Sequence, residues 1–72
     1  MHDFGEILAE NRKKKGYSQS DLVDLLSQEG IQVTTKAIGR IERGERNPSL
    51  EIAIRLAHYL KVPVEDIFQV ED

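Results

Sequence analysis

Residues 36–50 read KAIGRIERGERNPSL, and this stretch decides the fold. Ile38 and Ile41 are three residues apart, which places both on one face of a short helix. Gly44 favours the end of that helix, and the Asn-Pro-Ser of residues 47–49 favours the start of another. The segment therefore predicts a short helix that is anchored by few apolar contacts and exposes long polar side chains.

The charge of the chain is unevenly distributed around this segment. Residues 12–46 hold eight Lys or Arg and five Asp or Glu, whereas the remainder holds two and eight, for a net charge of −3. Because surface charges act over about 8 Å at physiological salt, a basic face with acidic ends is compatible with phosphate binding. Lys13, Lys14 and Lys15 belong to the basic half, although cations at a helix end also suit the helix dipole.

The size and composition limit the class of protein. Seventy-two residues make one domain, 1–72, with one small core, and the absence of cysteine excludes disulfides and thiolate metal sites. No apolar run is long enough to span a membrane and the first residues lack the pattern of a secretory signal, so we expect a cytoplasmic protein. The acidic pairs at 65–66 and 71–72 suit a helix start and a chain end rather than a metal site.

Apolar spacing and capping residues predict an all-α domain with five helices and no strand. The expected helices span residues 4–15, 19–29, 35–43, 49–60 and 64–69. The fourth should bury a stripe of apolar side chains, namely Leu50, Ala53, Leu56, Ala57 and Leu60. The fifth should close the bottom of the core with Val64, Ile67 and Phe68.

Four motifs together resemble the Xre or Cro/cI-type helix-turn-helix family, which consists of phage-repressor-like DNA-binding domains. They are SQ at 18–19, IGRIERG at 38–44, NPSL at 47–50 and VPVEDIF at 62–68. The resemblance covers about residues 4–68. It implies a compact five-helix fold in which the helix 35–43 is the recognition helix in the major groove, and a homodimer that reads two half-sites.

The chain departs from the family pattern in two places. Val23 stands where a small residue, most often alanine, is usual, so the crossing of the second and third helices is expected to shift. Residues 27–31 lengthen the connection between these helices, and we expect an extended turn through residues 32–33.

The resemblance also assigns roles in DNA binding. In the recognition helix, Thr35 is expected to reach a base edge and Lys36 a guanine or a phosphate oxygen. Arg40 could bind guanine, grip a phosphate, or pair with Glu42 or Glu45. Gly39 is expected on an exposed face, where it either lets the backbone approach the DNA or is simply a small neutral residue. Gln19, in the first turn of the second helix, is expected to meet a phosphate or a base edge.

The loop after the recognition helix should meet the DNA backbone, with Arg43, Arg46 and Asn47 as phosphate contacts. Glu42 would repel DNA unless it were neutralised. The family pattern pairs this carboxylate with an Arg on the first helix, which predicts a structural Arg12–Glu42 ion pair.

A dimer contact is expected on the fourth helix. Ile52 and Tyr59 are seven residues apart and share a face beside the core stripe, and Ile67 or Val70 could extend that face. The expected partners are thus double-stranded DNA and a second copy, with no membrane and no small-molecule substrate.

Catalysis is not expected, because no nucleophile–base pair, zinc motif or phosphate-binding glycine loop is present. No cofactor is implied. The leading hypothesis is a sequence-specific transcriptional regulator, most simply a repressor. A protein-interaction module, such as an antitoxin or an adaptor of the same fold, is the alternative. The chain could act alone, as restriction-system controllers do, or form the DNA-reading part of a longer regulator.

Overall fold

The computed structural model describes residues 4–62, which form four α-helices and no strand. Their order is α1 (Phe4–Lys15), α2 (Gln19–Gln28), α3 (Thr35–Glu42) and α4 (Leu50–Leu60). The expected boundaries hold to within one residue. The predicted fifth helix, 64–69, lies outside the described residues.

Local hydrogen bonds explain why the helices begin where they do. Ser18 forms a reciprocal capping box with Asp21 at the start of α2. Thr34 and Ser49 accept hydrogen bonds from backbone N–H groups in the first turns of α3 and α4. These three caps set the entry points of the helices that follow α1.

α2 ends in a Schellman motif, which begins the connection to α3. Gly30 has φ +80°, its N–H donates to Ser27, and the N–H of Ile31 donates to the carbonyl oxygen of Leu26. Ile31 packs against the core, as expected for the residue after such a stop. The chain then runs without helix through residues 31–34, which is the extended turn predicted from the sequence.

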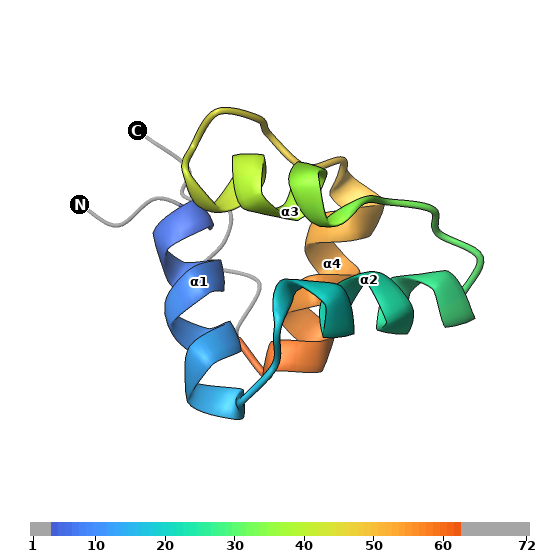
Figure 1. Cartoon of the computed structure of the whole chain (residues 1–72), viewed down its shortest axis with the longest axis horizontal. Coiled ribbons are helices and arrows are strands. Elements are labelled where there is room, and N and C mark those ends of the chain that lie inside the picture. The colour runs from blue at the N-terminus through green and yellow to red at the C-terminus, as the bar shows by residue number, and fades with distance from the viewer. Residues whose placement is uncertain (1–3, 63–72) are drawn as a thin grey trace.

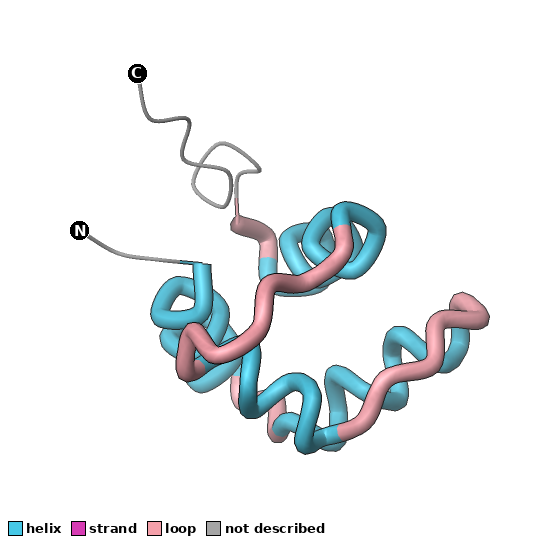
Figure 2. The backbone as a smooth tube through the Cα atoms, turned by 90° about the horizontal axis from the view of Figure 1, so that it is seen from above, coloured by secondary structure: helices cyan, strands magenta, loops and turns pink. Residues whose placement is uncertain are grey.

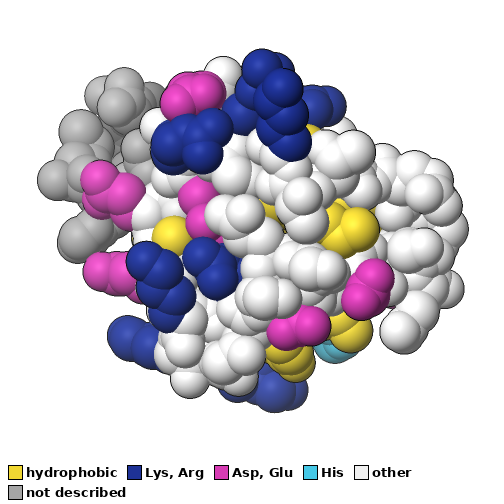
Figure 3. Space-filling model, in the orientation of Figure 1, with side chains coloured by type: hydrophobic (Ala, Val, Ile, Leu, Met, Phe, Trp, Pro, Cys, Tyr) yellow, Lys and Arg dark blue, Asp and Glu magenta, His cyan; other side chains and the backbone are white. Residues whose placement is uncertain are grey.

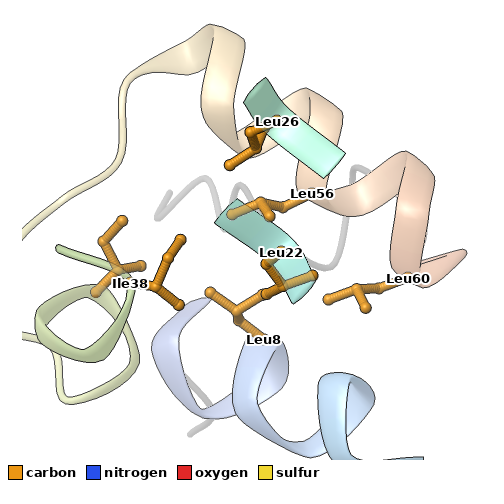
Figure 4. Packing of buried hydrophobic residues seen from close by; sticks show 7 residues of the cluster. Leu8, Leu22, Leu26, Ile38, Leu56 and Leu60 are labelled. Carbon is orange, nitrogen blue, oxygen red and sulfur yellow. The ribbon is translucent and has the colours of Figure 1, made fainter. Parts of the chain in front are cut away.

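The helices enclose one apolar core. α1 packs against α3 and α4, and α2 packs against the same two helices. Figure 1 shows α3 at the top of the molecule with α4 behind it, and Figure 2 shows the same arrangement from above. Figure 4 shows side chains from all four helices converging on the centre, and the buried residues of this cluster are Leu8, Leu22, Leu26, Ile38, Ile41, Leu56 and Leu60.

The predicted core stripe of α4 is wrong at one of its five residues. Leu50 is 64% exposed, whereas Ala53, Leu56, Ala57 and Leu60 are buried. Leu50 is the first residue of α4, and the cover by the neighbouring helices does not reach this end of the stripe. Val64, Ile67 and Phe68 lie outside the described residues.

α1 and α3 approach each other more closely than the sequence suggested. A Cβ placed on Gly5 would lie 2.6 Å from the carbonyl oxygen of Glu42 and would also overlap that of Ile41. Since the backbone of α3 occupies the space of a side chain, only glycine fits here. The poor helix propensity of glycine within the first turn of α1 is the sequence signal of this close approach.

Candidate nucleic-acid interface

α3 is apolar toward the core and polar toward solvent. Ile38 and Ile41 are almost fully buried, whereas Thr35, Lys36 and Arg40 are exposed. The eight residues of α3 thus separate into two faces, because the isoleucines are spaced by one turn. The predicted base-reading side chains of this helix lie together on its free side.

Cations continue from α3 into the loop that follows it. Arg43, Arg46 and Asn47 are all exposed. Figure 3 shows Lys and Arg side chains along the upper edge of the molecule, where Figure 1 places α3 and this loop, and others over α1. This surface therefore carries positive charge, although acidic side chains lie among the cations.

Glu42 is held by three groups from two other helices. Arg12 donates through Nε to Oε2 at 2.7 Å and through Nη2 to Oε1 at 3.2 Å. Gln19 donates through Nε2 to Oε1 at 3.1 Å. The Arg12 and Glu42 side chains are only 12% and 8% exposed, and Arg12 also donates to the carbonyl oxygen of Tyr17. This ion pair joins α1, α2 and α3, and it neutralises the carboxylate that would otherwise oppose an anion.

Gly39 was expected on an exposed face of α3, and this expectation is wrong. Its residue is buried, and a Cβ placed there would lie 3.2 Å from Nη1 of Arg43 and 3.6 Å from Nε2 of Gln19. The correction has a simple cause, because the long side chains of Gln19 and Arg43 extend over α3 at this point. Glycine therefore makes room for two polar groups of the protein itself.

Arg43 has a partner of its own in the free protein. Its Nε donates to Oε2 of Glu45 at 2.8 Å, and both side chains are more than half exposed, at 58% and 54%. The hydrogen bond from Arg43 and the positive charge of its guanidinium lower the pKa of Glu45 below its ordinary value. The same contact raises the pKa of Arg43.

Ile52 and Tyr59, the two residues predicted to contact a second copy, are less exposed than the sequence suggests, and the dimer contact itself stays a prediction. Both residues are partly buried and pack against the core, and the Tyr59 hydroxyl donates to the carbonyl oxygen of Leu25 at 3.1 Å. Within residues 4–62, the large apolar side chains that lie exposed are Leu50 and Ile54, at 64% and 45%. Ile67 and Val70 lie outside the described residues.

Other kinds of site find no basis in the part of the chain that the structure describes. Among residues 4–62, no group of three or more His, Asp or Glu side chains is arranged to hold a metal ion. No helix in the same range is long and apolar enough to cross a bilayer. The acidic pairs at 65–66 and 71–72 lie outside the described residues.

Comparison with known proteins identifies the architecture. A family model described as helix-turn-helix matches residues 8–67. The chain belongs to the helix-turn-helix family. This is a family of non-enzymatic regulators that bind DNA, in agreement with the resemblance and with the expectation that the chain is not an enzyme.

Relatives and a solved structure support this assignment. A protein of Pyrococcus furiosus that bears the name of an HTH-type transcriptional regulatory protein is 37% identical over 70 residues, or 93% of this chain and 21% of its own length. One of Thermococcus kodakarensis with the same kind of name is 44% identical over 52 residues, or 72% of this chain and 15% of its own length. The chain thus spans between 15% and 21% of these two curated relatives.

The crystal structure of the restriction-modification controller protein C.AhdI from Aeromonas hydrophila superposes with a TM-score of 0.71. It is 37% identical, and the match covers 90% of this chain and 91% of that one. The helix-turn-helix domain is therefore similar both to a part of long regulators and to nearly the whole of a small controller.

Proposed function

We propose that this protein is a sequence-specific regulator of transcription that acts as a repressor and binds double-stranded DNA in the cytoplasm. α3 would enter the major groove. The observation that carries the proposal is the division of α3 into a buried apolar face and a free face with Thr35, Lys36 and Arg40. Membership of the helix-turn-helix family supports it.

The side chains on this face suit base edges. Lys36 and Arg40 can donate to guanine, and a bidentate contact from Arg40 would contribute about 1–3 kcal/mol of discrimination. Thr35 can contact a thymine methyl group or a base acceptor. Their exposure leaves them free to reach these groups without rearrangement of the core.

Gln19 is more restricted than the sequence suggests. Because one N–H of Nε2 donates to Glu42, the amide keeps its Oε1 atom and one further N–H for a ligand. The oxygen suits the exocyclic amino group of adenine or cytosine. We therefore expect Gln19 to read one of these bases, and Gly39 keeps the space in which the amide lies.

The remaining cations suit the DNA backbone. Arg43 and Arg46 lie exposed beyond the end of α3, with Asn47 beside them as an uncharged donor, and Lys13–Lys15 lie exposed at the end of α1. Each phosphate that they neutralise would contribute about 0.9 to the slope of log affinity against log salt. These contacts would fix the position of α3 in the groove without reading sequence.

Selection from a pool of random DNA duplexes tests the proposal, followed by fluorescence anisotropy of the selected duplex over a salt series. We expect one enriched sequence and an affinity that falls steeply with salt. Failure to bind any duplex at low salt, or binding that ignores salt, would overturn it. A protein partner that covers α3 in stoichiometric amount would favour the interaction module instead.

Two lysine-to-glutamine substitutions distinguish a contact with a base from a general effect of positive charge. Lys36→Gln should reduce the preference for the selected duplex over a scrambled one, because it removes a base contact. Lys61→Gln removes the same charge at the end of α4 and should leave that preference unchanged. Equal effects of the two substitutions would contradict a role of Lys36 in reading sequence.

The exposed apolar side chains of α4 suit a second copy of the chain. Leu50 and Ile54 are flanked by Glu51 and Arg55, which are exposed and carry opposite charges one turn apart. In a two-fold contact between antiparallel helices, Glu51 of each subunit can lie beside Arg55 of the other. Arg55 also pairs with Glu29 at 2.9 Å within its own subunit, which holds the guanidinium at this surface.

Sedimentation velocity with and without a duplex carrying two half-sites tests the dimer. We expect Ile54→Asp to abolish binding of the second subunit and to leave the fold intact, because Ile54 is exposed. Ile52→Asp is not a suitable comparison, since that residue packs on the core. Two bound subunits of the Ile54→Asp variant at the wild-type concentration would refute this surface.

A further inference from the structure

Arg43 and Glu45 form an ion pair on the surface that we assign to DNA. Nε of Arg43 lies 2.8 Å from Oε2 of Glu45, and Nη2 lies 3.5 Å from Oε1. One edge of the guanidinium therefore faces both oxygens of one carboxylate. Both side chains remain more than half exposed, at 58% and 54%, so a ligand can reach the pair from solvent.

Arg43 also lies close to α3 through its other nitrogen atom. Its Nη1 lies 3.2 Å from the point that a Cβ of Gly39 would occupy, and the Gln19 amide lies 3.6 Å from the same point. The guanidinium thus extends back over α3 and lies beside a predicted base-reading group. It does not point away from the helix, as an unconstrained loop cation would.

A phosphate group would use the edge of the guanidinium that Glu45 occupies. The Nε and Nη2 atoms of arginine bind two oxygens of a carboxylate or of a phosphate in the same planar geometry. The two anions cannot occupy this edge together, since each needs both N–H directions.

We propose that Glu45 is an internal competitor for the phosphate-binding edge of Arg43, and that it weakens binding to the DNA backbone whatever the base sequence. The inference rests on the proposed function. Contact with DNA would break the Arg43–Glu45 pair, and the released carboxylate would then face the phosphates. Because phosphate contacts carry no sequence information, the competition from Glu45 lowers the affinity for all DNA and leaves sequence recognition to α3.

The electrostatics of the loop keep the competitor charged. The hydrogen bond from Arg43 lowers the pKa of Glu45, and its charge and that of Arg40 add to this effect. At neutral pH the carboxylate is therefore ionised and available to Arg43.

The test is a double-substitution cycle measured by fluorescence anisotropy on the selected duplex and on a scrambled one. The proteins are the wild type, Glu45→Gln, Arg43→Gln and the double variant. Glu10→Gln serves as a matched control, because Glu10 is exposed on α1 and its loss changes the net charge by the same amount. Far-UV circular dichroism and thermal unfolding check that each variant is folded.

We expect Glu45→Gln to tighten binding about two- to fivefold per subunit on both duplexes at low salt, as suits an exposed pair. In the Arg43→Gln background the same substitution should have a clearly smaller effect, because only the repulsion between the carboxylate and the phosphates is then removed, and Glu10→Gln should have none in either. An equal gain with and without Arg43 would show general repulsion and overturn the competitor, and so would no gain at all. If the wild type binds neither duplex, the proposed function fails and this inference falls with it.

Discussion

Two carboxylates three residues apart at the end of α3 have opposite surroundings. Glu42 is bound by Arg12 and Gln19, with side-chain exposures of 12% for Arg12 and 8% for Glu42. Glu45 is bound by Arg43, with exposures of 58% for Arg43 and 54% for Glu45. Both pairs use the same groups at nearly the same distance, 2.7 Å and 2.8 Å. The degree of burial therefore decides whether such a pair holds helices together or can exchange its carboxylate for an external anion.

The span of each pair along the chain explains this difference. Arg12 and Glu42 are 30 residues apart, so their contact joins separate helices and cannot be lost without disturbing the packing around it. Arg43 and Glu45 are two residues apart, so their contact links only one turn of loop. An external anion can replace the second pair while the fold remains intact, but it cannot replace the first.

The largest effect is expected when the buried pair is broken on one side. Glu42→Ala leaves the Arg12 guanidinium little exposed and without its carboxylate, which should lower the free energy of unfolding by about 3 kcal/mol. Because a core of this size rarely supplies more than about 3–5 kcal/mol, much of the protein should be unfolded. Urea denaturation followed by circular dichroism measures the change.

The control for that variant removes both charges. Arg12→Met combined with Glu42→Leu should recover most of the lost stability, since no unpaired charge is then buried. A Glu42→Ala protein as stable as the wild type would mean that the pair behaves like the exposed one.

A smaller effect is expected from closing the space between α1 and α3. Gly5→Ala forces a methyl group against two backbone carbonyl groups of α3, which cannot rotate away, and should lower stability by about 1–3 kcal/mol. Gly39→Ala is the matched control, because its new methyl group meets mainly the end of the flexible Arg43 side chain. It should retain or raise stability, given the better helix propensity of alanine.

Thermal unfolding of the two alanine variants under one set of conditions makes this comparison. If Gly39→Ala were the more destabilised protein, the close approach of α1 to α3 would not limit the residue at position 5.

The smallest effect concerns the exposed pair. The folded-state pKa of Glu45 is lowered, so its contribution to stability is present above the ordinary glutamate pKa of about 4.3 and is lost as the pH falls through the lowered value. A carbon-detected NMR titration should give Glu45 a midpoint below that of an ordinary glutamate and a return toward the ordinary midpoint in Arg43→Gln. An unchanged midpoint would show that the two side chains do not pair in solution.

The helix ends were predictable because short-range chemistry sets them. Ser18 and Thr34 cap the next residues along the chain, and Gly30 adopts the positive φ that ends α2. The exposure of Thr35, Lys36 and Arg40 on α3 was also predictable, since the two isoleucines fix which side turns inward, but the burial of Gly39 was not. Each of these features depends on neighbours within a few residues.

The predictions about α4 failed where burial depended on other helices. Leu50 fits the apolar stripe of an isolated helix, yet it lies exposed, whereas Tyr59 is partly buried with its hydroxyl bound to α2. Periodicity gives the apolar side of a helix. How many residues on that side are buried depends on where the neighbouring helices end. The exposed apolar side chains of α4 are therefore Leu50 and Ile54 and not the predicted Ile52 and Tyr59.

The sequence by itself determined an all-helical domain, the limits of the four described helices, and a cationic segment around α3, because caps, glycines and periodicity act locally. Only the tertiary structure decided that Gln19 donates an amide N–H to Glu42 and that the backbone of α3 touches Gly5. It also decided that Glu45 pairs with Arg43 in contact with solvent. These features depend on how segments far apart in the chain exclude water from one another, and no local pattern records that.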